Sequence, residues 1–121
     1  MARILIIDDD QDILDFVSSC LEDTHTVTTA ANGEEGMVAC EKSVFDLIIT
    51  DIFMPYRDGL DIICEVRVLY PDIKIIAMTA YVGEGVTDYL KAAELIGAHY
   101  KLEKPLSVEN VLEAVNDILK D

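Results

Sequence analysis

Six polar residues lie at the ends of short strand-like segments in this sequence, and their types suit chemistry on a divalent cation or on a phosphoryl group. They are Asp8, Asp9, Asp10, Asp51, Thr79 and Lys104. Carboxylates crowded near one point repel each other, which costs stability. A hard divalent cation with a preference for oxygen ligands removes that cost, and Mg²⁺ typically takes one or two carboxylates together with a phosphate oxygen. The acidic residues therefore indicate a magnesium site.

Asp51 is the central carboxylate and the candidate nucleophile. A carboxylate can attack phosphorus and form an aspartyl phosphate, a reaction that needs little beyond positioning and charge neutralisation. Lys104 would supply a compact positive charge on a flexible stem, and Thr79 would supply a hydroxyl donor. We therefore predict that Asp8 and Asp9 face Asp51, and that Thr79 and Lys104 lie beside it.

Each of these residues also has an ordinary structural explanation. Asp9 or Asp10 would cap the first helix, and we assign Asp10 to that role. Taken alone, Thr79 is a common residue at the end of a strand and Lys104 is a common surface lysine. Their joint occurrence after separate strands makes the prediction specific.

The elements that must position these residues alternate between short apolar runs and amphipathic helical patterns. The predicted strands cover residues 3–7, 25–29, 45–50, 73–78 and 99–102, and the helical patterns cover 11–22, 32–41, 62–69, 86–93 and 108–119. Pro71 and Gly97 follow the third and fourth helices, and Ser107 is the predicted N-cap of the fifth. We predict an α/β fold, a (βα)5 flavodoxin-like doubly wound parallel sheet of strand order 2-1-3-4-5, as one domain over residues 1–121. In such sheets ligands bind at the carboxyl ends of the strands.

Composition narrows the possible partners. The 24 acidic and 9 basic residues give a formal net charge of −15, which argues against direct nucleic-acid binding and against docking on anionic lipid. No segment approaches the length of a membrane span. Cys20, Cys40 and Cys64 lie in apolar stretches without metal-ligand spacing, so we expect buried structural thiols in a reducing cytoplasm.

Four segments carry a family resemblance, which covers essentially the whole chain. They read ILIIDDD, DLIITDIFMPYRDGL, MTA and KP. As a set they resemble the receiver domain of two-component response regulators. The resemblance implies that Mg²⁺ is bound directly by Asp9 and mainly through water by Asp8. Asp51 would be both a metal ligand and the phosphoacceptor, and the backbone carbonyl of Phe53 would complete the protein ligands.

The same resemblance extends to the phosphoryl group and its source. Thr79 and Lys104 would bind the phosphoryl group, and the Lys104–Pro105 peptide bond would be cis. The donor would be a phosphohistidine on a sensor histidine kinase or a phosphotransfer protein, with small phosphodonors as substitutes. A downstream protein target or an output domain would respond to the phosphorylated state. Such a receiver catalyses its own phosphorylation and slow dephosphorylation, so we do not expect a turnover enzyme.

Two features depart from the family pattern. An aromatic residue usually lies three positions before the lysine, and here that position is Lys101. Tyr100 is adjacent, but strand alternation points its side chain to the opposite face of the sheet unless a bulge in the strand turns that side chain round. Alternatively, Lys101 is simply a solvated charge on an edge strand. The stretch that leads to Lys104 is also a few residues longer than is common, and Gly83 and Gly85 predict a mobile loop or a frayed first turn in its helix.

Three other functions remain as alternatives. A metal-dependent phosphohydrolase with an aspartate nucleophile needs a second carboxylate two residues later, where this chain has Phe53. A flavin-binding electron carrier of the same fold would need a Ser/Thr/Gly-rich loop after the first strand, where the three aspartates would repel a phosphate. A phosphorylation-independent interaction module would keep the fold, and Lys101 leaves that alternative open.

Phe53 and Tyr81 lie two residues after Asp51 and Thr79. Their large side chains would either shield an acyl phosphate from water or simply pack in the protein.

The length of the chain is compatible with two origins of the sequence. It fits a stand-alone receiver that acts through protein contacts. It also fits a fragment of a longer regulator. The sequence alone does not decide between the two.

Overall fold

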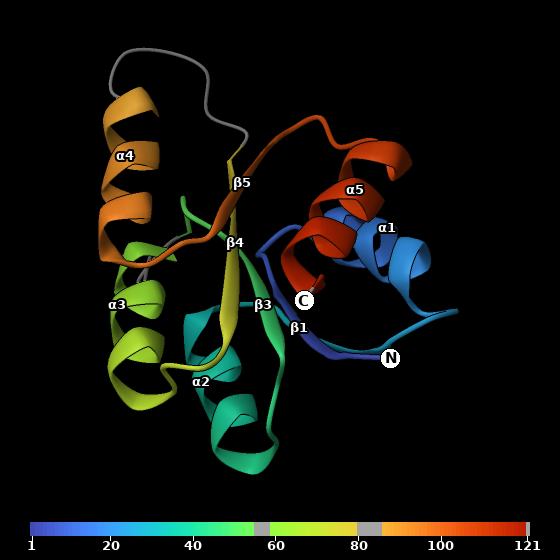
Figure 1. Ribbon diagram of the computed structural model, residues 1–121, viewed down its shortest axis with the longest axis horizontal. Coiled ribbons are helices and arrows are strands. Elements are labelled where there is room, and N and C mark those ends of the chain that lie inside the picture. Colours follow the sequence, from blue (N-terminus) through green and yellow to red (C-terminus); the bar gives the residue numbers. More distant parts are fainter. Residues whose placement is uncertain (55–58, 80–85, 121) are drawn as a thin grey trace.

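The computed structural model describes residues 1–54, 59–79 and 86–120, with only the backbone for residues 86–90. In this part of the chain the strands are β1 (Arg3–Ile7), β2 (Thr26–Ala30), β3 (Leu47–Asp51), β4 (Lys74–Thr79) and β5 (Tyr100–Glu103). The helices are α1 (Gln11–Leu21), α2 (Gly33–Lys42), α3 (Gly59–Leu69), α4 (Val86–Ile96) and α5 (Val108–Leu119). Strands and helices alternate along the chain (Figure 1).

The sheet has the order β2-β1-β3-β4-β5, and every paired strand runs parallel to its neighbour. This result confirms the predicted fold class and strand order. β1 and β3 are adjacent at the centre of the sheet, so the residues that follow them lie at the same edge. That edge is the switch point of the topology, where ligands bind in open parallel sheets.

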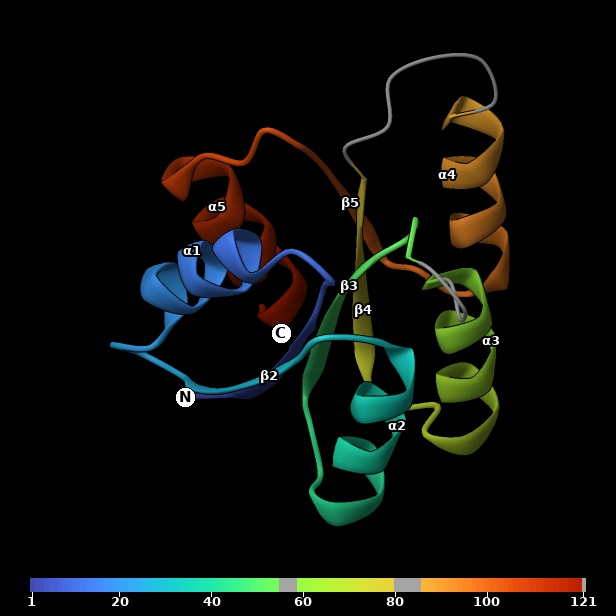
Figure 2. The same ribbon diagram turned by 180° about the vertical axis from the view of Figure 1, so that it is seen from behind.

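The two faces of the sheet pack against different helices. Figures 1 and 2 show α1 and α5 together on one side and α2, α3 and α4 on the other. Alternation along β1 divides its residues, with Ile4 and Ile6 packing in the cluster that contains α1 and α5. Leu5 and Ile7 pack in the cluster that contains α2, α3 and α4. Burial on both faces explains why the strands are almost entirely apolar.

The bounds of β1 match the predicted 3–7, and those of the other strands differ from the predicted ones by one or two residues. The third strand, predicted as 45–50, is Leu47–Asp51. It begins after Asp46, whose N–H donates to the carbonyl of Arg3 and whose carboxylate accepts from the N–H of Arg3, each at 2.8 Å. It ends later because Asp51 still pairs with Met78. Asp51 is therefore the last residue of its strand, and Thr79 is likewise the last residue of β4.

The predicted N-caps of the first and fifth helices and the glycine predicted to end the fourth are confirmed, although α1 to α4 differ from the predicted ranges by one to three residues at one or both ends. The Asp10 carboxylate accepts from the N–H of Asp12 at 2.9 Å, which makes Asp10 the N-cap of α1. Ser107 caps α5 through a 3.1 Å bond from the N–H of Asn110 to its hydroxyl. Gly97 follows α4 with φ of +126°, a left-handed conformation that glycine adopts without strain.

The cysteine prediction is correct at one position and wrong at another. Cys40 is buried, Cys20 is partly buried, and all three cysteines are free. Cys64 is exposed, because Ile63 and Val66 with their neighbours form the buried stripe of α3 and helical spacing turns Cys64 outward.

No helix in the described ranges has the length and apolar character needed to cross a membrane.

Two histidines join the edge strands to their neighbours. Nδ1 of His25 accepts from the N–H of Ala2 at 3.0 Å, and Nδ1 of His99 accepts from the N–H of Ile75 at 3.1 Å. An accepting Nδ1 requires the neutral ring with its proton on Nε2. Burial lowers the pKa of both rings, in agreement with that geometry.

Gly59, at the start of α3, lies against the backbone of the strand end that carries Asp51. A Cβ at this position would contact the Asp51 carbonyl oxygen and would come within 2.7 Å of the Ile52 Cα. Gly59→Ala is therefore expected to lower the free energy of unfolding by about 2–3 kcal/mol, because neither backbone group can move aside. Urea unfolding measures the change.

Gly36→Ala is the matched control for that substitution. Its Cβ would meet side-chain atoms of Ile7, the nearest being the terminal Cδ1, and no backbone atom is among its three nearest neighbours. Alanine also favours the helix by about 1 kcal/mol over glycine. A Gly59→Ala protein as stable as the Gly36→Ala protein would contradict the close approach described here.

Candidate functional site

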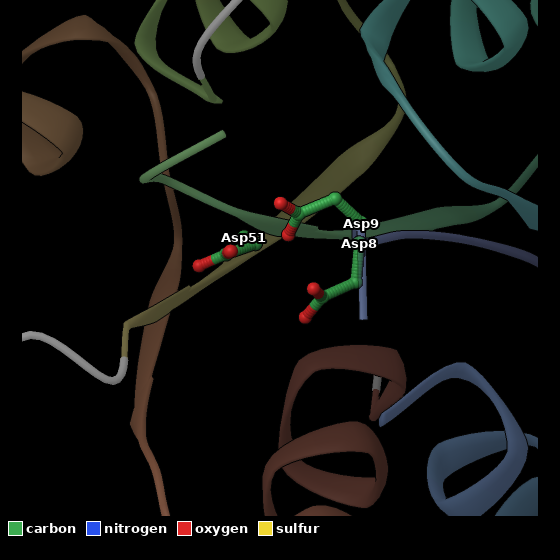
Figure 3. A group of neighbouring side chains, drawn as sticks. All are labelled: Asp8, Asp9 and Asp51. Atoms are coloured by element: carbon green, nitrogen blue, oxygen red, sulfur yellow. The ribbon is translucent and has the colours of Figure 1, made fainter. Parts of the chain in front are cut away.

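Three carboxylates meet at the carboxyl edge of the sheet. Asp8 follows β1 directly, Asp9 comes next, and Asp51 ends β3. One carboxylate oxygen from each lies within 4.8 Å of the others (Figure 3). They come together because β1 and β3 are hydrogen-bonded neighbours. The structure thus places these three predicted residues in one group, whereas the Asp10 carboxylate points to its capping bond with α1.

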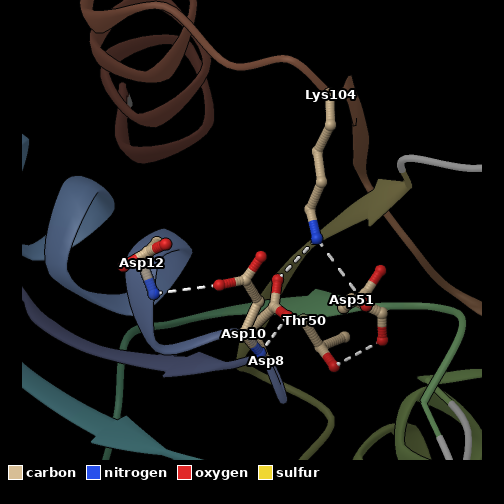
Figure 4. A network of polar contacts seen from close by, with 6 residues as sticks. All are labelled: Asp8, Asp10, Asp12, Thr50, Asp51 and Lys104. Carbon is tan, nitrogen blue, oxygen red and sulfur yellow. Dashed lines mark hydrogen bonds and ion pairs between the residues drawn. The ribbon is translucent and has the colours of Figure 1, made fainter.

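Lys104 reaches into the same group from the segment after β5 (Figure 4). Its Nζ lies 2.7 Å from Oδ2 of Asp8 and 3.7 Å from Oδ2 of Asp51. Its backbone N–H donates to the carbonyl of Thr79 at 2.7 Å, which ties the segment after β5 to the end of β4. The Lys104–Pro105 peptide bond is cis, as the resemblance implied.

Burial controls the electrostatics of the two inner carboxylates. Asp51 is 4% exposed, and its pKa is raised to about 6, chiefly by burial and then by the charge of Asp8. Lys104 and the backbone N–H of Phe53 oppose that rise. Asp8 is fully buried, and burial raises its pKa although Lys104 stabilises the charged form. Both carboxylates are thus held in a setting that penalises negative charge.

The donor set fits a hard cation. Oδ1 of Asp51 is buried and has no hydrogen-bond partner within the described ranges. Both oxygens of Asp8 are already engaged, Oδ1 by the N–H of Asp10 and Oδ2 by Lys104. The Asp9 side chain is exposed at the rim. Three carboxylates with one nearby ammonium leave an excess of negative charge, and oxygen ligands of this kind suit Mg²⁺.

Thr79 is 2% exposed at the end of β4, beside Asp51 in the sheet order. The Phe53 side chain is half-buried and packs against the cluster of α2, α3 and α4. The role of the Phe53 backbone carbonyl as a Mg²⁺ ligand remains a prediction. Tyr81, Gly83 and Gly85 lie outside the described residues.

Lys101, which stands where the family pattern has an aromatic residue, contacts a neighbouring helix. Lys101 forms an ion pair with Glu94 of α4, and both side chains remain more than a third exposed. The register from Tyr100↔Ile76 to Leu102↔Met78 is continuous, so no bulge turns Tyr100 round. Tyr100 packs instead in the cluster of α1 and α5. The prediction from strand alternation is therefore confirmed.

Sequence reasoning missed Thr50. This residue is fully buried in β3, and its hydroxyl donates to the backbone carbonyl of Asp51 at 3.0 Å (Figure 4). The signal in the sequence was a hydroxyl in the otherwise apolar run that leads to the central carboxylate. Nothing in that signal identified the partner of the hydroxyl.

The strand order and the acidic group at the switch point define the class of this protein. It is a flavodoxin-like α/β domain with a polar site at the carboxyl ends of β1 and β3. The family model of the response regulator receiver domain matches residues 4–116. The chain therefore belongs to the receiver domains of response regulators, the proteins of two-component signalling.

Individual relatives agree with this assignment. The probable C4-dicarboxylate response regulator DctR of Halalkalibacterium halodurans is 37% identical over 118 residues, which cover 95% of this chain and 50% of that protein. Response regulator SaeR of Staphylococcus aureus is 33% identical over 120 residues, 98% of this chain and 51% of that protein. The chain thus spans about half the length of these curated relatives.

Among solved structures, the chemotaxis protein CheY4 of Vibrio cholerae has a TM-score of 0.90 and 31% sequence identity. The alignment covers 98% of this chain and 99% of the CheY4 chain. A receiver domain from Clostridium thermocellum has a TM-score of 0.88 and 32% identity, covering 98% of this chain and 94% of that one. The fold of this chain is therefore that of known receiver domains along nearly its full length.

Proposed function

We propose that this domain accepts a phosphoryl group on Asp51 in a Mg²⁺-dependent reaction and thereby changes its contacts with a protein partner. The observation that carries the proposal is the buried Asp51 carboxylate, which lies beside Asp8, Asp9 and Lys104 and has one oxygen without a hydrogen-bond partner among the residues that the structure describes. Such a group is at once a candidate nucleophile and a candidate metal ligand.

Each residue has a distinct part in the proposed reaction. Asp9 and Asp51 would bind Mg²⁺ directly, the Phe53 carbonyl would complete the protein ligands, and Asp8 would act mainly through water, since both of its oxygens are engaged. The ion would neutralise one side of the transferring group. Lys104 would neutralise another side, and the Thr79 hydroxyl would donate to a remaining phosphoryl oxygen.

The donor in this proposal is a phosphohistidine on a sensor histidine kinase or a phosphotransfer protein. A carboxylate oxygen of Asp51 forms the new bond to phosphorus while the bond from phosphorus to the imidazole nitrogen breaks. The electron pair stays on that nitrogen. The products are an acyl phosphate and a free histidine, and water later hydrolyses the acyl phosphate slowly. The domain would thus modify itself once per cycle and would not act as a turnover enzyme.

A downstream protein target or an output domain would respond to the modified state. The curated relatives are about twice as long as this chain, which leaves room in them for a further region. The three free thiols agree with a reducing cytoplasm as the site of action.

Incubation with Mg²⁺ and acetyl phosphate, followed by intact mass measurement, tests the proposal. We expect the parent protein to gain the mass of one phosphoryl group. The gain should disappear in EDTA and in the Asp51→Ala variant. Asp23→Asn, which changes an exposed carboxylate remote from β3 in the sequence, should keep it.

Two results would count against the proposal. One is the absence of any adduct on a folded parent protein that also fails to form a stable beryllofluoride complex. That result would favour an interaction module that works without phosphorylation. The other is an adduct that persists in Asp51→Ala, which would place the acceptor elsewhere.

A further inference from the structure

Thr50 is a buried polar residue that packing alone does not require. It is fully buried in β3, and Ile48, two residues earlier on the same face, is buried against α2 and α3. A valine would fill nearly the same volume without a hydroxyl to desolvate. The hydroxyl instead has a partner, since Oγ1 lies 3.0 Å from the backbone carbonyl oxygen of Asp51. This bond is internal to the strand end that carries the proposed phosphoacceptor.

The peptide between Asp51 and Ile52 is held on three sides. The Thr50 hydroxyl donates to its carbonyl oxygen. Its N–H, which belongs to Ile52, donates to the carbonyl of Met78 in β4 at 2.9 Å. Gly59 lies directly against the same carbonyl because it has no Cβ. This peptide determines the direction of the Asp51 side chain and leads the backbone toward Phe53.

We propose that Thr50 is a positioning residue, whose hydroxyl fixes the peptide after Asp51 and so holds the Asp51 carboxylate in its reactive position. This inference rests on the proposed function, because the position matters only if Asp51 reacts. The hydrogen bond that the Thr50 hydroxyl makes goes to the backbone carbonyl of Asp51 and not to a side chain of the acidic group, so Thr50 would act through the backbone. Reactions that depend on positioning lose rate steeply when a reacting atom moves.

Three variants separate the hydroxyl from the packing. Thr50→Val removes the hydroxyl and keeps the shape, and Thr50→Ser keeps the hydroxyl and removes a methyl group. Ile48→Val is the matched control, because it trims a buried side chain on the same strand and face without touching the Asp51 carbonyl. Each variant is first shown to be folded by its thermal unfolding midpoint.

The first measurement is the rate of phosphorylation at saturating acetyl phosphate and Mg²⁺. Thr50→Val is expected to lose about tenfold in this rate, whereas Thr50→Ser and Ile48→Val stay within about twofold of the parent. A purely structural role predicts that rate loss follows loss of thermal stability in all three variants. Either that correlation or an unchanged rate in Thr50→Val would overturn the proposal.

The second measurement does not depend on phosphorylation. Amide hydrogen exchange at Ile52 reports how firmly the peptide after Asp51 is held. Thr50→Val is expected to accelerate exchange at Ile52 more than at Ile49, while Ile48→Val does not show this selectivity. An unchanged Ile52 amide would overturn the proposal even if the protein were phosphorylated. An accelerated Ile52 amide in a protein that takes no phosphoryl group would instead locate the failure in the proposed function.

Discussion

Replacing Lys104 by methionine is expected to lower the free energy of unfolding of the metal-free protein by about 2–4 kcal/mol at pH 8. Methionine keeps most of the apolar stem and removes the ammonium that lies 2.7 Å from Asp8 and 3.7 Å from Asp51. Asp8 is fully buried and Asp51 is 4% exposed, so water cannot replace the lost partner. The loss therefore reflects two buried carboxylates left together without their counter-charge. Urea unfolding in EDTA measures it.

Lys101→Met is the matched control for that substitution. Lys101 pairs with Glu94, but the two side chains are 40% and 48% exposed, and exposed pairs of this kind contribute about 0–1 kcal/mol. Adding Asp8→Asn to Lys104→Met should recover much of the loss, because it removes the carboxylate that depends most on the lysine. Equal losses from the two lysine substitutions, or no recovery in the double variant, would contradict the electrostatic account.

The sequence predicted those features of the site that follow from topology. In a parallel sheet the carboxyl ends of all strands lie at one edge, so recognising the strands was enough to bring Asp8, Asp51, Thr79 and Lys104 together. Strand alternation also placed Tyr100 on the correct face. These predictions depend on periodicity and strand order, which the pattern of apolar residues encodes directly.

Features that depend on particular side-chain contacts did not follow from the pattern. The exposure of Cys64 depends on the rotation of α3, which its buried neighbours determine. The Lys101–Glu94 pair depends on how α4 lies against β5. The bond from Thr50 to the Asp51 carbonyl depends on a side-chain rotamer. Such contacts arise from the packing of separate elements, and no local period in the sequence specifies them.

Asp51→Asn is expected to stabilise the metal-free protein, by an amount that grows with pH. The pKa of Asp51 is raised to about 6 in the folded state, against about 3.9 for an unperturbed aspartate in the unfolded chain. The folded protein therefore binds more protons between these two values, and its stability falls as the pH rises through that window. Above pH 6 the full penalty applies, which at 1.36 kcal/mol per pKa unit is about 2–3 kcal/mol. Asparagine carries no charge and avoids it.

The difference in unfolding free energy between Asp51→Asn and the parent isolates this effect. His25 and His99, whose pKa values are lowered, make both proteins more stable as the pH rises toward 6.5. Their contributions cancel in the difference. We expect that difference to be near zero at pH 4 and about 2 kcal/mol at pH 8 in EDTA. Mg²⁺ should stabilise the parent more than Asp51→Asn, because a cation relieves the same repulsion that the amide removes. An Asp51→Asn protein less stable than the parent at pH 8 without metal would mean that the carboxylate is well solvated or fully paired, and the site as described would have to be rejected.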